Sequence, residues 1–178
     1  MIKRRISEYS SFVILLFCML LIYYKLLLPA FLVYIIWYCL FGMVGLAFLC
    51  NTKGKIKLSE FFLKITIPAT LLPLRRSFYY WTKSVNVIML NPAHVSEAYE
   101  IAQKVKVDNL YTDNNKSFFL CFLAALLNDL GQREKAYEYI KISQQLPHNS
   151  FVDVTLERLK KAMDEETKKA STPTENLI

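Results

Sequence analysis

The stretch LNDLGQREKAYEYIKISQQLP, residues 127–147, decides the fold class of this chain. Its apolar residues recur at helical spacing among polar and charged ones, which is typical of a helix that packs on one side. A second stretch, VSEAYEIAQKV (95–105), aligns without gaps with REKAYEYIKIS (133–143) at an offset of 38 residues. Two segments that share one pattern at a fixed offset indicate repeated helical units. We therefore expect an all-α protein.

These segments resemble the tetratricopeptide repeat (TPR), a helix–turn–helix unit of about 34 residues. In the better copy, residues 117–150, Gly131 stands at the turn between the two helices. Ala124 and Ala136 stand where small residues let the paired helices approach closely. The copy before it lacks the turn glycine. The resemblance covers about residues 79–150.

A further helix over residues 151–169 would cap the end of this stack, so we expect a TPR-like helical domain at residues 79–169. The last segment, residues 170–178, is expected to be a disordered tail. Each repeat buries its apolar face only against its neighbours, so two repeats and a cap need additional packing. The preceding part of the chain can supply it.

The TPR resemblance implies a groove, lined by the first helix of each pair, that binds a peptide or a helix of another protein. Carried over residue by residue, the partner-binding groove consists of Phe118, Cys121, Phe122, Ala125, Asn128 and Asp129. Family members that grip a terminal carboxylate use lysine and asparagine there, and Cys121 and Ala125 cannot do so. The run SFFLCFLAALL (117–127) is apolar on nearly every face. It indicates either plain core or a groove that accepts an apolar helix.

The N-terminal part of the chain is strongly apolar. Residues 12–28 contain one charge, Lys25, and residues 30–50 contain none. The hydrocarbon core of a bilayer takes about 20 apolar residues in a helix. These runs therefore predict two membrane spans, at about residues 10–28 and 30–50, which together make a transmembrane hairpin over residues 1–50.

Basic residues are concentrated on the same side of both predicted spans. Residues 1–90 hold eleven Lys or Arg against two Asp or Glu, whereas residues 91–178 hold eleven against thirteen. Because Lys and Arg near a span stay on the cytoplasmic side, we expect both termini to be cytoplasmic. The sequence thus predicts an integral membrane protein.

A basic and aromatic connector, residues 51–78, follows the second predicted span. Lysines beside aromatic side chains are attracted to an anionic bilayer surface. The residues expected to contact the membrane surface are Lys53, Lys55, Lys57, Phe61, Phe62 and Lys64. The alternative is that the connector is buried against the repeats, and both descriptions can hold in different parts of it.

Signatures of catalysis and metal binding are missing from the sequence. The four cysteines form no CxxC pair, and His94 and His148 have no neighbours at metal-ligand spacing. No glycine-rich phosphate loop, GxSxG or HExxH motif is present. We therefore expect no enzyme activity, catalytic residue, metal or cofactor. The basic residues lie among membrane-seeking apolar runs, so nucleic acid is not an expected partner.

The favoured function is a membrane-anchored scaffold or adaptor that presents a TPR-like domain to another protein in the cytoplasm. The expected partners are that protein and the lipid bilayer. The alternative is a small accessory subunit of a larger integral membrane complex, such as a transporter or secretion assembly, bound through its transmembrane helices.

Overall fold

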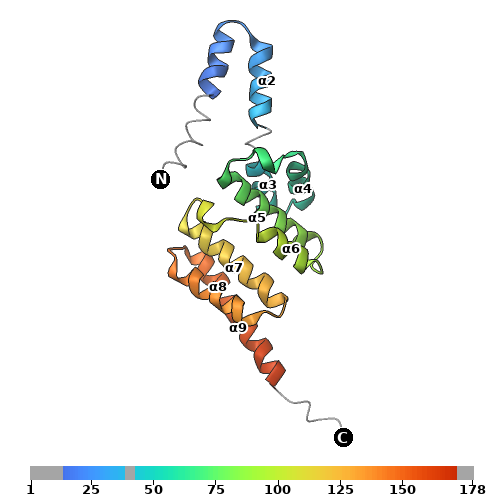
Figure 1. Cartoon of the computed structure of the whole chain (residues 1–178), viewed down its shortest axis with the longest axis vertical. Coiled ribbons are helices and arrows are strands. Elements are labelled where there is room, and N and C mark those ends of the chain that lie inside the picture. Colours follow the sequence, from blue (N-terminus) through green and yellow to red (C-terminus); the bar gives the residue numbers. More distant parts are fainter. Residues whose placement is uncertain (1–13, 39–42, 172–178) are drawn as a thin grey trace.

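The computed structural model describes residues 14–38 and 43–171 (Figure 1). Throughout these two ranges the chain forms α-helices and short 3₁₀-helices and no β-strand, which confirms the prediction of an all-α fold. Residues 172–178 of the expected disordered tail lie outside the described residues, whereas the two residues before them belong to the last helix.

Most of the described chain is a stack of helix pairs (Figure 1). Each pair consists of consecutive helices joined by a short turn, and each packs against the next pair. The pairs are α3 (Met43–Thr52) with α4 (Ile56–Ile65), α5 (Pro73–Leu90) with α6 (Val95–Ala102), and α7 (Asp113–Asp129) with α8 (Arg133–Gln145). The long helix α9 (Ser150–Ser171) packs on α7 and α8. The 3₁₀-helices η2 (Pro68–Thr70) and η3 (Val107–Asn109) lie in the connections between pairs.

The turns of the first and third pairs have the same geometry. Gly131 follows α7 with φ +74°, and Gly54 follows α3 with φ +69°. In the third pair, the amide of Gly131 donates to the carbonyl of Asn128 and that of Gln132 to the carbonyl of Leu127, both at 2.8 Å. Equivalent bonds surround Gly54. This arrangement satisfies the last carbonyls of the helix and needs a left-handed residue, which glycine supplies without strain.

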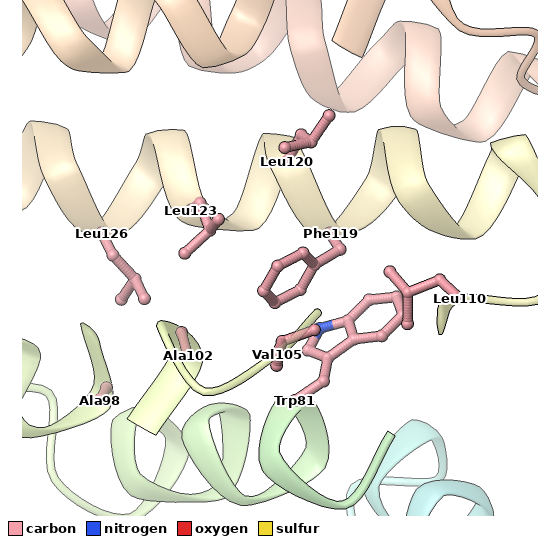
Figure 2. Close-up of a cluster of buried hydrophobic side chains, with 9 residues drawn as sticks. All are labelled: Trp81, Ala98, Ala102, Val105, Leu110, Phe119, Leu120, Leu123 and Leu126. Atoms are coloured by element: carbon pink, nitrogen blue, oxygen red, sulfur yellow. The ribbon is translucent and has the colours of Figure 1, made fainter. Parts of the chain in front are cut away.

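Three clusters of buried side chains hold the stack together. Figure 2 shows the first, in which Trp81 of α5 lies under Phe119 of α7 and beside Leu110. The second lies between α7, α8 and α9 and includes Leu127, Ile140 and Leu156 of those helices. The third joins α3, α4 and α5 and consists of Val44, Ala47, Leu63, Leu71 and Tyr79. The first helix pair therefore packs on α5 and extends the core that the second and third pairs form.

The predicted spans differ from what the structure shows over the part of the chain that it describes. In the described ranges, no helix has both the length and the apolar composition needed to cross a membrane. This finding contradicts the prediction of an integral membrane protein with both termini cytoplasmic, and the spans at about 10–28 and 30–50 are not supported. The described residues of the second belong to α2 (Leu27–Trp37) and to α3, while residues 39–42 of it lie outside the described residues. At 1.5 Å per residue each helix is about 16 Å long, roughly half of a bilayer core.

Two short helices precede the stack and lie side by side (Figure 1). Residues 14–23 are helical, and α2 returns alongside them. Lys25 occupies the left-handed position of the turn, with φ 59°. The thiol of Cys18 donates to the carbonyl of Ala30 at 3.7 Å, and Ala30 is buried at this contact. A cavity of about 410 Å³ lies here, lined by Cys18, Ile22, Leu27, Ala30, Phe31 and Tyr34.

A candidate protein-interaction surface

Aromatic rings form a continuous series across the first helix of each pair and α9. Phe48 of α3 lies 6.1 Å from Trp81 of α5, Trp81 lies 5.7 Å from Phe118 of α7, and Phe118 lies 5.5 Å from Phe151 of α9, all measured between ring centroids. Phe78 of α5 adds contacts of 5.8 Å to Phe48 and 5.7 Å to Trp81. We call these five residues the aromatic strip.

The aromatic strip has a buried centre and an exposed end. Trp81 is 3% exposed, because Phe119 covers it from α7. Phe48, Phe78 and Phe118 are half-buried. Phe151 is 63% exposed although its ring meets Phe118 edge to face. Such a large apolar side chain fixed by a packed neighbour is a common anchor for a binding partner.

Local structure explains why Phe151 stands at this end. Two contacts hold the preceding segment: His148 Nε2 lies 2.8 Å from Asp153 Oδ1, and the backbone amide of Asn149 donates to Asn114 Oδ1 at 2.9 Å. Helix α9 then buries Val152 in the second cluster. Because neighbouring residues on a helix point in different directions, Phe151 projects toward α7 and the solvent.

The predicted groove residues do not form one surface. Phe118 belongs to the aromatic strip, and Phe122 is half-buried against Phe119, with ring centroids 6.4 Å apart. Cys121 is buried in the second cluster, since α9 packs on this side of α7. Burial raises the pKa of its thiol to about 11.

The remaining groove residues lie nearer the end of α7. Ala125 is half-buried, Asn128 is buried beside the turn at Gly131, and Asp129 is exposed. Two of the predicted groove residues, Cys121 and Asn128, are therefore buried. The other four are at least partly exposed: Phe118, Phe122, Ala125 and Asp129.

The predicted membrane-surface residues all lie on α4 or on the turn before it. Lys53, Lys55, Lys57, Phe61 and Lys64 are exposed. Phe62 differs, because it is half-buried and packs against the third cluster. Helix α4 is thus packed on one side, so part of the connector is buried against neighbouring helices, and its other side is exposed.

The sequence analysis missed Phe48, Phe78 and Phe151. One signal could have found them: an aromatic residue occurs on each helix that begins a pair and at the start of α9. Phe48 was hidden from this pattern because it lies in a run interpreted as a membrane span.

Titratable groups in the described residues do not converge on a site. His94 pairs with Glu97 at 3.1 Å, and both side chains are about half exposed. No group of three or more metal-ligand side chains occurs in the ranges that the structure describes. The aromatic strip is therefore the candidate site. The chain matches no protein-family model, and no curated protein or solved structure is significantly similar to it.

Proposed function

We propose that this protein is a protein–protein interaction module, a scaffold or adaptor, that binds an apolar or amphipathic helix of another protein along the aromatic strip. The observation that carries the proposal is the exposure of Phe151, 63%, at the end of a ring series that crosses four helices. Buried aromatic anchors dominate the energetics of many protein interfaces.

The spacing of the rings favours a helix as the occupant. The steps from Phe48 through Trp81 and Phe118 to Phe151 are 6.1, 5.7 and 5.5 Å. Each step is close to the pitch of an α-helix, about 5.4 Å. A helix laid along the strip would contact its accessible members, Phe48, Phe118 and Phe151, in the manner of helix-in-groove recognition, whereas the buried Trp81 supports them from inside the stack.

The helix pairs support the interpretation as TPR-like units. Ala124 and Ala136 are fully buried where α7 meets α8, and Gly131 makes the turn. In TPR proteins the first helices of the pairs line the groove, and the aromatic strip lies on the corresponding helices α3, α5 and α7. The TPR assignment and the recognition of a partner helix remain parts of one proposal.

The experiment is site-specific photocrosslinking in cells that express the full chain. A benzophenone amino acid replaces Phe151, Phe48 or, as the matched control, Ile142 of α8, which is 47% exposed. We expect positions 151 and 48 to crosslink to the same helix of one partner, at sites separated by no more than roughly eleven residues, or three turns, because the three ring-to-ring steps set the longest possible span. Position 142 should not crosslink to it.

A substitution completes the test. Phe151→Glu places a charge at the exposed end of the strip and should abolish the crosslink from position 48 to that partner, whereas Ile142→Glu should preserve it. Crosslinks from all three positions to unrelated proteins would contradict the proposal. So would a partner that is captured equally by the Phe151→Glu variant.

The alternative function, in which two transmembrane helices bind a larger integral membrane complex, is not proposed. It depends on spans, and the described helices do not provide them.

A further inference from the structure

Helix α4 has one face inside the stack and one outside. Ser59 and Leu63, one turn apart, are fully buried against α3 and α5. On the opposite side, Leu58 is 42%, Phe61 57% and Ile65 47% exposed. A helix that already buries one face does not need large apolar side chains on its other face for folding. This second apolar face is therefore a candidate site of contact with another molecule or surface.

Four lysines lie on α4 and on the turn before it. Lys57 and Lys64 lie on α4, and Lys53 and Lys55 lie on the turn that leads into it; all four are exposed. In the described part of the chain, none of them has an acidic partner within ion-pair distance. The four positive charges are thus available to an anionic ligand.

Acidic residues do not compensate this charge. Glu60 is the only Asp or Glu between residues 9 and 96 of the sequence. It is half-buried, and its Oε2 accepts a hydrogen bond from Asn86 Nδ2 at 3.3 Å. The carboxylate is therefore directed toward α5, whereas the lysines face the solvent.

We propose that the exposed face of α4 binds the surface of a bilayer that contains anionic lipids. Phe61, Leu58 and Ile65 would enter the boundary between headgroups and acyl chains, and the lysines would contact lipid phosphates. Interfacial helices combine these two features: apolar side chains on one face and Lys or Arg beside them. The contact is peripheral, so it needs no helix that crosses the bilayer.

The apolar residues decide between a lipid surface and another polyanion. Nucleic acid and acidic proteins attract lysines, but they offer no apolar phase for a row of Leu, Phe and Ile side chains. The fold also favours the contact, because α3 and α5 hold α4 in its helical form before it binds. A free peptide of this length would have to pay the entropy of helix formation on the membrane.

The test uses a local probe, because the apolar residues 14–38 can associate with vesicles by themselves. The full chain is synthesised without detergent in the presence of vesicles, with a benzophenone amino acid in place of Phe61 or, as control, of Tyr137 on α8, which is 40% exposed. The vesicles contain phosphatidylcholine alone or with about one-third phosphatidylserine. Photocrosslinking to lipid is measured over a series of salt concentrations.

We expect position 61 to crosslink to lipid at least tenfold more in the anionic vesicles than in the neutral ones, and position 137 to crosslink to neither. The yield should fall with salt. Lys57→Gln with Lys64→Gln should lower it about tenfold or more, since each basic residue near the surface contributes about a fivefold factor in binding. The matched pair Lys135→Gln with Lys141→Gln on α8, which changes the net charge equally, should leave it unchanged.

Three results would overturn the proposal. Equal crosslinking of position 61 in neutral and anionic vesicles would show that other apolar residues bring the chain to the bilayer. An unchanged yield of lipid crosslinking in the Lys57→Gln, Lys64→Gln variant would show that these lysines do not contribute to membrane binding. Finally, vesicle flotation that depends on these lysines without any lipid crosslink at position 61 would indicate adsorption to a charged surface, as on any polyanion.

Discussion

Ser117 and Ser143 join the two helices of the third pair through reciprocal hydrogen bonds. Ser117 Oγ donates to the carbonyl of Ser143, and Ser143 Oγ donates to the carbonyl of Ser117, both at 2.9 Å. The two hydroxyl oxygens lie 2.8 Å apart, and both residues are fully buried. The start of α7 is thereby tied to the end of α8 at a point where only small side chains fit.

A smaller and a larger side chain at position 117 should therefore lower the free energy of unfolding by different amounts. Ser117→Ala loses one hydrogen bond and should lower the free energy of unfolding by about 1 kcal/mol. Ser117→Val also forces the helices apart and should lower it by about 2–3 kcal/mol. The measurement is urea unfolding of the full chain followed by circular dichroism. Ser96→Val, at an exposed site on α6, is the control and should stay within about 0.5 kcal/mol.

The three glycines with described surroundings should respond differently to alanine. At Gly131 and Gly54, φ is +74° and +69° and an added Cβ meets no atom within 4 Å, so the cost is purely that of the left-handed backbone, about 1 kcal/mol. Gly45 lies inside α3, where a Cβ would approach Arg75 at an ordinary 3.5 Å. Gly45→Ala should therefore stabilise the protein by about 0.5–1 kcal/mol. The measurement is thermal or urea unfolding of the three variants. A change of stability in the same direction in all three would contradict this explanation.

A buried polar network fixes how the first two pairs meet. Asn86 of α5 is fully buried, and its Oδ1 accepts from Asn51 Nδ2 at 2.7 Å while its Nδ2 donates to Ser59 Oγ at 3.0 Å. Asn86→Leu leaves these partners unsatisfied and should cost about 2–3 kcal/mol of unfolding free energy. Adding Ser59→Ala removes one stranded hydroxyl and should restore part of that loss. If the losses of unfolding free energy from the two substitutions simply add in the double mutant, Asn86 and Ser59 are not coupled and this explanation is wrong.

The sequence was sufficient for the third helix pair because its constraints are local. Gly131 is needed for the turn, and Ala136 and Ile140 recur at helical spacing on a face that is buried. The packing of α9 on α7 and α8 is also consistent with its apolar stripe. Which side of α7 it covers depends on tertiary packing, however, and so the burial of Cys121 could not be predicted.

Helix α3 of the first pair was assigned to a membrane span because hydropathy does not distinguish lipid from protein as the apolar environment. Val44 and Ala47 are apolar since they pack in the third cluster. A signal for the correct assignment was nevertheless present. Residues 45–65 and 122–142 align without gaps at an offset of 77, which matches Ala47 with Ala124, Asn51 with Asn128, and Gly54 with Gly131.

The thiol of Cys121 should make stability depend on pH in the alkaline range. Burial raises its pKa from 9.0 to about 11, so the folded state retains a proton that the unfolded state releases. Its contribution to stability is fully present below pH 9 and is lost as the pH rises toward 11. Cys121→Ser should flatten this slope in unfolding free energy measured from pH 8 to pH 11. An identical slope in the variant and the wild type would exclude Cys121 as its source.

The most direct test of the architecture is Ala47→Leu. Ala47 is fully buried where α3 meets α4 and α5, at a position that Ala124 occupies in the third pair. Three additional carbons cannot fit there without separating the helices, so the free energy of unfolding should fall by about 2–3 kcal/mol. Leu49→Ala, on the same helix but 48% exposed, should change it by less than about 0.5 kcal/mol. If α3 did not pack in the stack, the two substitutions would change the free energy of unfolding by equally small amounts, and the prediction would be wrong.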